Sequence, residues 1–332
     1  MQAAFFIEEI RTCTHYHFFL SSLYAIMSQI TAPVVCVGAS LVDITFRCEQ
    51  EPILQTSNPS LIRKSPGGVV RNIAHHLSLL GVKTELLTVI GEDSDGDWLI
   101  SQCSQAGIGL RQIKRTVVPT GVFASITSPT GDLTIGAVTS ETDVYLNHDF
   151  IHERLETIRN AALVVADCNL STETLRELIR LCNLYAIPLI IETVSIPKAT
   201  RLKEALPGNL FLIKPNREEL AVFEKDTHVT PEEKISHLHE QGFRHVWLSR
   251  GAEGSLFSDG KEMWTLPAPR VQVVDVNGAG DASLAGWIFA WLNGHDPLRC
   301  LKSGHAAAAC LLEVHGAVRE DLSEELLKKH FT

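Results

Sequence analysis

Asp281 stands directly behind two glycines, Gly278 and Gly280, at the start of an apolar segment. Glycines at the start of a helix leave backbone N–H groups open to an anion, and the helix dipole favours negative charge there. A carboxylate at such a site could take the proton of an alcohol while the amides stabilise a transferred phosphoryl group. The spacing therefore indicates phosphoryl transfer, with Asp281 as base and Gly278, Ala279 and Gly280 as anion hole. The simpler alternative is a carboxylate that only stabilises the start of the helix.

The helix that must position Asp281 is predicted to extend to residue 292, because apolar residues recur at helical spacing up to Asn293 and Gly294. Two other phosphate motifs fail in detail. A dinucleotide fingerprint would need glycine at position 283, where Ser283 stands. A Walker A loop would need four residues between its glycines, whereas five follow Gly254 before the next glycine. Neither motif explains the glycines.

Two further stretches are compatible with a nucleotide site. Asn216 and Glu219 follow a predicted strand and lie three apart on one helix face, where they could hold phosphate oxygens and magnesium-bound water. The equally simple alternative is a helix-capping asparagine beside a solvated glutamate. Ser249, Gly251 and Gly254 follow another strand and could lie along a nucleotide, although an ordinary hairpin would have the same pattern.

An acceptor site is predicted where Gly67 and Gly68 open another helix, which ends at Gly81. Glycines allow close approach of a ligand, and Asn72 one turn later could offer a donor and an acceptor to vicinal hydroxyls. Asp43 is a further acceptor for a sugar diol. Each of these residue types is also common in turns, so only their combination indicates a site.

Short apolar runs alternate with helical patterns along most of the chain. Continuous apolar runs between helices are typical of strands that are buried on both faces of a parallel sheet. The sequence therefore predicts an α/β/α sandwich with a mostly parallel central sheet. The predicted strands are residues 34–38, 86–91, 163–167, 188–193, 210–215 and 245–249.

Two segments interrupt this alternation, at about residues 43–63 and 118–140. The first has no convincing helix, and the second contains two apolar runs around a Pro-Thr-Gly-Asp turn at 129–132. Together they predict a small β-sheet that projects as a lid over the carboxyl ends of the strands, where ligands of α/β folds bind. Its exposed edges could pair across a two-fold axis and form a homodimer.

Composition restricts the location and the partners of the chain. With 39 acidic and 29 basic side chains in 332 residues the net charge is −10, which argues against nucleic-acid binding. The 8 cysteines form no CxxC pair, so a reducing, cytoplasmic compartment is expected. Neither His75 and His76 nor His237 and His239 have a third ligand at a recognisable spacing, so no metal site is predicted from them.

The first part of the chain differs from the rest. The apolar run 18–27 is too short to span a membrane, and Glu8 and Glu9 precede it where a signal peptide needs positive charge. Residues 1–31 are therefore predicted to be a poorly ordered extension, unless translation begins at Met27. The α/β domain is predicted to extend over residues 32–322, with a tail at 323–332.

Taken together, these segments resemble the ribokinase (PfkB) family of carbohydrate and nucleoside kinases, from about residue 34 to residue 318. The most specific part is Asp275-x-x-Gly278-Ala279-Gly280-Asp281. The resemblance implies transfer of the ATP γ-phosphate to a primary hydroxyl, with Mg²⁺ and a role for K⁺. It also implies a role for each of the following groups. The base is Asp281 and the anion hole is formed by residues 278–280. Phosphate and Mg²⁺ lie by Asn216 and Glu219, and ATP lies by Ser249, Gly251 and Gly254. The sugar is bound by Asp43, Gly67, Gly68 and Asn72, and a monovalent-cation loop contains Asp275.

Within this family the segment from Gly67 to Asn72 and the segment 165–171 are most similar to pseudouridine kinases. A nucleoside base would give Arg71 or Asn169 a hydrogen-bond partner, although Arg71 could instead pair with a carboxylate. Pseudouridine is therefore the predicted acceptor, and a free sugar such as ribose or fructose, or another nucleoside such as inosine, remains an alternative. A sugar or nucleoside binder without catalysis is a third hypothesis.

Three positions depart from the pattern of the family. Asn277 and Ser249 stand where threonine is frequent, and Glu192 where aspartate is common. These departures bear on the cation loop and on the fit of the nucleotide, and they leave the base and the anion hole intact.

Overall fold

The computed structural model describes residues 32–224, 226 and 228–331. Its centre is an eight-stranded sheet in the order β14-β13-β12-β11-β10-β9-β1-β4, in which the six strands from β12 to β4 are parallel and β13 and β14 are antiparallel additions. The strands of this sheet are β1 (Val34–Val37), β4 (Thr84–Leu87), β9 (Leu163–Asp167), β10 (Leu189–Glu192), β11 (Leu210–Ile213), β12 (Phe243–Ser249), β13 (Ser255–Ser258) and β14 (Met263–Leu266).

Helices cover both faces of this sheet, because side chains alternate between two buried cores. Val35 and Val37 of β1 belong to one core, and Val34 and Cys36 belong to the other. The helices of the first core are α4 (His148–Glu153), α5 (Leu155–Arg159), α6 (Thr172–Leu184), α7 (Ile196–Ala205), α8 (Arg217–Phe223) and α9 (Pro231–Glu240). The helices on the opposite side are α2 (Val69–Leu79), α3 (Ser94–Gln105), α10 (Ala279–Leu292), α11 (Pro297–Leu312) and α12 (Glu324–Lys329).

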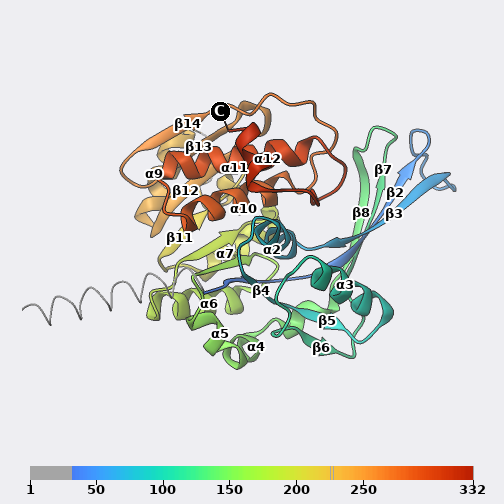
Figure 1. Ribbon diagram of the computed structural model, residues 1–332, viewed down its shortest axis with the longest axis horizontal. Coiled ribbons are helices and arrows are strands. Elements are labelled where there is room, and N and C mark those ends of the chain that lie inside the picture. Colours follow the sequence, from blue (N-terminus) through green and yellow to red (C-terminus); the bar gives the residue numbers. More distant parts are fainter. Residues whose placement is uncertain (1–31, 225, 227, 332) are drawn as a thin grey trace, which may run out of the picture.

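A second sheet of four strands, in the order β3-β2-β7-β8, projects from this body (Figure 1). Its strands are β2 (Leu41–Cys48), β3 (Ser60–Gly67), β7 (Val122–Thr127) and β8 (Leu133–Thr139). The short pair β5 (Val89–Gly91) and β6 (Lys114–Thr116) and the 3-10 turns η1 (Glu141–Tyr145) and η2 (Gly251–Glu253) complete the described elements. Because β2 follows β1 directly and β3 leads into α2, the projecting sheet is tied to the body at its base.

The predicted α/β/α sandwich with a mostly parallel sheet and a small additional sheet is confirmed. The predicted strand 86–91 is divided in two, because Thr88 separates β4 from β5, and the two parts pair with different strands. The predicted N-terminal extension lies outside the described residues, and the domain boundaries stay a prediction.

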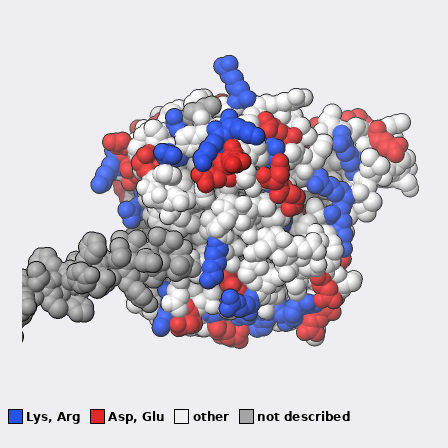
Figure 2. Space-filling model, viewed as in Figure 1, with Lys and Arg blue, Asp and Glu red and all other residues white. Residues whose placement is uncertain are grey.

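Three surface and composition features complete the description. None of the helices in the described ranges combines the length and the apolar character needed to cross a membrane. The seven described cysteines are free and buried. Basic and acidic side chains are interspersed over the face shown in Figure 2, around a broad uncharged area.

Candidate active site

The polar residues of the candidate site meet where the parallel strands end. Asp167 and Glu192 are the last residues of β9 and β10, and Lys214 follows β11. The start of α10 lies at the same edge, since Gly280 lies beside Lys214, whose Nζ would be 3.4 Å from a Cβ added to the glycine. This is the edge at which α/β folds bind their ligands.

Asp281 lies in the first turn of α10, is 8% exposed and does not cap the helix. Its Oδ2 accepts a 2.8 Å hydrogen bond from Nδ2 of Asn72 in α2. Burial raises the pKa of Asp281 to about 6, while the bond from Asn72 and the charges of Lys214 and Arg71 act in the opposite direction. A pKa near neutrality suits a general base, so this geometry favours the chemical interpretation over the helix-start alternative.

Gly278 is the N-cap residue of α10 and has a φ of 74°, which favours glycine. A Cβ at this position would lie 2.7 Å from Cα of Ala317, so the loop around Ala317 packs directly on the helix start. The glycine therefore allows both the turn and the close approach. The first N–H groups of a helix have no partner within it. In α10 the Ala279 amide donates to the carbonyl of Val276 at 3.3 Å, and the next amides of the first turn lie beside Asp281.

Asn72 and Arg71 form a connected network behind Asp281. The Arg71 guanidinium donates to Oδ1 of Asn72 and, at 2.6 Å, to the carbonyl of Pro66, and it lies 3.2 Å from Nδ1 of His75. Arg71 is only 2% exposed. The Arg71 guanidinium therefore orients Asn72, and Asn72 in turn holds Asp281. A contact of Arg71 with the base of a nucleoside stays a prediction.

The predicted sugar-binding residues meet at the base of the projecting sheet. Asp43 in β2 pairs in register with Ser65 of β3, and its carboxylate lies over Gly67, where an added Cβ would be 2.6 Å from Cγ of Asp43. Gly68 has a φ of 106° and packs against the backbone of residues 39–40. Burial raises the pKa of Asp43 to about 6, and the Arg71 charge opposes this shift. The two glycines therefore bring Asp43 and the start of α2 together.

Asn216 and Glu219 form the capping box of α8. Oδ1 of Asn216 accepts from the Glu219 amide at 2.8 Å, and Oε2 of Glu219 accepts from the Asn216 amide at 3.0 Å. Oε2 also accepts a 2.7 Å bond from the buried Thr193 hydroxyl. Both bonds end on Oε2, which leaves Oε1 for another partner. The asparagine therefore has its alternative role as a cap, whereas Glu219 is buried rather than solvated.

Ser249, Gly251 and Gly254 form the turn between β12 and β13. Ser249 ends β12 beside Asn216, so these two predicted nucleotide residues are neighbours. Gly251 has a φ of 58° and open space around it. Gly254 has a φ of 86° and passes close to the chain after β14, where an added Cβ would lie 2.7 Å from the Ala268 amide. This packing requires glycine at position 254, and the predicted place of Gly254 beside ATP stays a prediction.

Asp275 and Asn169 each have hydrogen-bond partners of their own. Asp275 connects two loops, because Oδ1 accepts from the Asn277 amide at 3.0 Å and Oδ2 from the Gly316 amide at 2.9 Å. Asn169 follows β9, and its Oδ1 accepts a hydrogen bond from Lys198. Lys198 and Lys214 were not predicted as site residues, since a lone lysine has no motif. The one signal in the sequence is position, because Lys214 directly follows a buried strand and Lys198 lies at the start of a helix.

The fold and the site define a class of protein. A buried carboxylate next to a glycine-rich helix start, with a lysine at the same edge, is suited to moving a phosphoryl group onto a hydroxyl. The chain is a phosphotransferase with an alcohol group as acceptor.

Comparison with known proteins identifies the family. Residues 31–324 match the pfkB family of carbohydrate kinases, and the chain belongs to this family. Pseudouridine kinase of Escherichia coli is 29% identical over 87% of this chain and 93% of its own length. Ribokinase of Arabidopsis thaliana is 25% identical over 86% of this chain and 77% of its own length. The structure of Arabidopsis thaliana ribokinase complexed with ribose and ATP has a TM-score of 0.79 at 21% identity, covering 90% and 98% of the two chains, which shows the shared fold.

Proposed function

We propose that the chain transfers the γ-phosphate of ATP to the 5′-hydroxyl of pseudouridine, giving pseudouridine 5′-phosphate and ADP. The observation that carries the kinase chemistry is the buried Asp281, held by Asn72 at the start of α10. In the proposed step the 5′-hydroxyl loses its proton to Asp281 and its oxygen forms the new bond to the γ-phosphorus. The bond to the β-phosphate oxygen breaks, and the amides of residues 278–280 stabilise the charge on the transferred group.

Magnesium and potassium belong to the same proposal. Glu219 fits a magnesium role because its carboxylate is buried at the carboxyl edge and its two bonds occupy only Oε2. Bound through water, Mg²⁺ would neutralise phosphate charge. Asp275 would support a K⁺ site indirectly, since it fixes the two loops at Asn277 and Gly316. Asn216, Ser249 and Gly251 are proposed to line the ATP site.

Two observations support pseudouridine as the acceptor. A relative that is similar over nearly the whole chain is named pseudouridine kinase. In addition, Asn169 and Lys198 form a polar pair after β9, at the same edge as Asp43 and Asp281. The base of pseudouridine has an N–H group where that of uridine has a C–H group, and a site with a carboxamide and an ammonium group can distinguish such edges. Free sugars and inosine are the alternative acceptors.

A substrate panel tests this choice. We expect ATP consumption with Mg²⁺ and K⁺ to have a higher kcat/KM for pseudouridine than for uridine, inosine, ribose or fructose. Asn169→Ala should lower kcat/KM for pseudouridine more than for ribose, since ribose has no base for Asn169 to contact. Preference for a free sugar would contradict the choice of acceptor and keep the kinase assignment. Absence of turnover with every acceptor would contradict both.

A pH profile tests the state of the two site carboxylates. Asp281 and Asp43 each have a pKa raised to about 6 by burial, and the proposed reaction needs both as anions. A carboxylate with a raised pKa becomes protonated as the pH falls through that value, so kcat/KM should decrease below about pH 6 and be constant above it. Because both groups must lose their protons, the decrease should be steeper than that of a single group, and repulsion between the two carboxylates separates the two apparent pKa values. A profile that stays flat down to pH 5 would contradict the role of Asp281 as base.

The projecting sheet is proposed to act as a lid and to join two copies of the chain. All seven residues of β8 are exposed at the edge of this sheet, including Ile135 at 54% exposure. Exposed strand edges pair with other strands. We expect sedimentation at micromolar concentration to show a dimer, Ile135→Glu to give a monomer, and Val117→Glu, at an 86% exposed position outside the sheet, to leave the dimer intact. A monomeric wild-type protein would contradict this proposal. A cytoplasmic location stays a prediction.

A further inference from the structure

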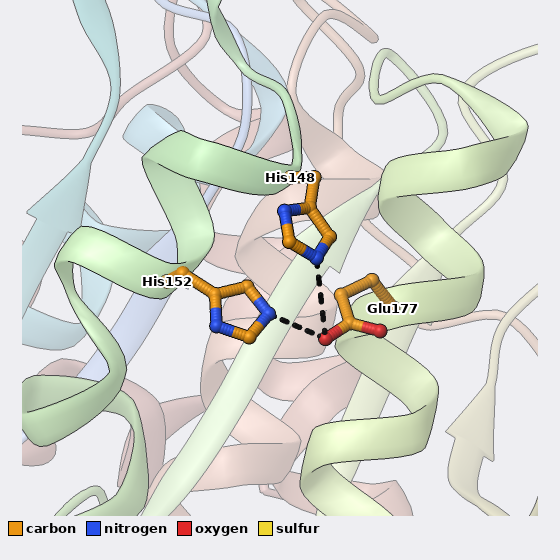
Figure 3. Close-up of side chains that lie close together, drawn as sticks. All are labelled: His148, His152 and Glu177. Atoms are coloured by element: carbon orange, nitrogen blue, oxygen red, sulfur yellow. Dashed lines mark hydrogen bonds and ion pairs between the residues drawn. The ribbon is translucent and has the colours of Figure 1, made fainter.

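Three side chains outside the candidate active site bring metal-binding atoms together. His148, His152 and Glu177 each offer one nitrogen or oxygen ligand, and these atoms all lie within 4.8 Å of one another (Figure 3). Nε2 of His152 is 2.6 Å from Oε1 of Glu177, and Nε2 of His148 is 3.9 Å from the same oxygen. Ligands about 2.0–2.1 Å from a tetrahedral zinc ion are separated by about 3.3 Å, a value between these two distances. Small side-chain rotations would therefore complete the geometry.

The two helices that carry these ligands are fixed by the core. His148 and His152 are four residues apart in α4, so they lie on the same face of the helix, and their rings stack with centroids 4.1 Å apart. Phe150 and Ile151, between them, are fully buried and anchor α4. Leu178 anchors α6 next to Glu177 in the same way. The core therefore sets the separation of the three ligand positions, while their side chains remain accessible to an ion.

His148 also has the outer partner that metal-binding histidines commonly have. Its Nδ1 lies 3.3 Å from Oδ1 of Asp149, while Nε2 faces Glu177. A carboxylate at the second ring nitrogen favours the tautomer whose Nε2 can bind a metal. Two imidazoles and a carboxylate leave one position for water on a tetrahedral ion, and imidazole ligands favour Zn²⁺ over Mg²⁺ or Ca²⁺.

One neighbour competes for the carboxylate. Arg180 donates to Oε2 of Glu177 at 2.8 Å and to Oε1 at 2.7 Å. The arginine side chain is 55% exposed, so it can move into solvent without leaving a buried charge. A typical surface ion pair contributes about 0–1 kcal/mol, and a bidentate arginine–carboxylate pair contributes more, so the three zinc ligands together must outcompete Arg180 for Glu177.

We propose that His148, His152 and Glu177 form a zinc-binding site that joins α4 to α6. The α4 segment follows β8 and η1 in the chain. The ion would therefore link the segment that comes from the projecting sheet to helix α6 of the body. This site could not be predicted from spacing in the sequence, because Glu177 lies 25 residues after His152 in a different helix. The proposal is independent of the acceptor and of the kinase reaction.

Calorimetric titration of the full chain with ZnCl₂ tests the site. We expect wild-type protein to bind zinc and His148→Ala and His152→Ala each to weaken this binding by about tenfold or more. Arg180→Gln should strengthen it, because Glu177 loses its competitor. His237→Ala is the matched control. Nδ1 of His237 lies 3.2 Å from Oε2 of Glu224, and this histidine–carboxylate pair does not include a second histidine. Loss of His237 should therefore leave zinc binding unchanged.

Thermal unfolding gives a second measurement. Zinc should raise the unfolding temperature of wild-type protein and of His237→Ala, since a ligand that binds the folded state stabilises it, and it should have a smaller effect on a His148→Ala, His152→Ala double variant. Cys13, His15 and His17 lie outside the described residues, and zinc bound by them would persist in the double variant. Equal affinity of wild type and double variant, or no zinc binding by the wild type, would overturn the proposal.

Discussion

Replacement of Asp281 by asparagine is expected to lower kcat by about 10²-fold or more, the range for loss of a general base. Asparagine has nearly the same shape and can keep a hydrogen bond to Asn72, but it cannot accept the proton of the acceptor hydroxyl. Acceptor binding should stay within about tenfold, because a base contributes to the transition state more than to the ground state. Steady-state kinetics combined with calorimetric titration of the acceptor separates the two effects.

The matched control for this variant is Asp95→Asn. Asp95 is a partly exposed carboxylate in the first turn of α3, paired with Lys64 at 2.6 Å. It is therefore also an acidic residue at a helix start, but it lies in a different helix and has no role in the proposed step. Near-normal kcat in Asp281→Asn would rule out Asp281 as the base. An equal loss in Asp95→Asn would show that helix stabilisation, rather than proton transfer, explains the result.

The parts of this site that the sequence could predict are local in the chain. Gly278, Gly280 and Asp281 lie within four residues, and the apolar periodicity that follows them fixes the helix. The strands were predictable for a similar reason, since burial on both faces of a parallel sheet requires a continuous apolar run. Local patterns therefore determine which elements exist and where each presents its polar residue.

The parts that could not be predicted depend on tertiary contacts. Asn72 and Asp281 are 209 residues apart, and only the packing of α2 against α10 makes them partners. Arg71 has the charge of a ligand-binding residue, yet α2 turns its side chain inward, where it bonds to Asn72 and Pro66. Burial is set by the packing of neighbouring elements, so the residue type alone could not assign this role.

Asn216 and Glu219 illustrate a different limit. A capping box and a phosphate site use the same residue types at the same spacing, because both place hydrogen-bonding groups at the start of a helix. The structure has the capping box, and it adds the bond from Thr193 that keeps Glu219 buried. These two functions are compatible, so only a measurement with nucleotide can assign the second one.

Gly278→Ala is expected to lower kcat by about 10²-fold, the effect of losing one amide donor of an anion hole. A methyl group at this position meets two obstacles. The φ of 74° is unfavourable for alanine by about 1 kcal/mol or more, and the added Cβ would lie 2.7 Å from Cα of Ala317. Because Ala317 contributes backbone here, relief requires either the loop around Ala317 or the first turn of α10 to move. We expect the amides beside Asp281 to be displaced, since Gly278 is the N-cap residue of this helix.

Gly294→Ala provides the matched control, because Gly294 lies just beyond the other end of α10 with a φ of 75° and open space around it. Alanine there has the same backbone strain without the steric conflict and far along the helix from Asp281. We expect both variants to lower the free energy of unfolding in urea, but only Gly278→Ala to lower kcat strongly. If Gly278→Ala does not fold, Gly280→Ala tests the same anion site. Among the described residues outside the helix, an added Cβ at position 280 comes near Nζ of Lys214 at 3.4 Å, so the variant should fold while its methyl group narrows the approach of a phosphate to the amides. Normal turnover in both Gly278→Ala and Gly280→Ala would mean that the phosphoryl group is held elsewhere, even if Asp281 is the base.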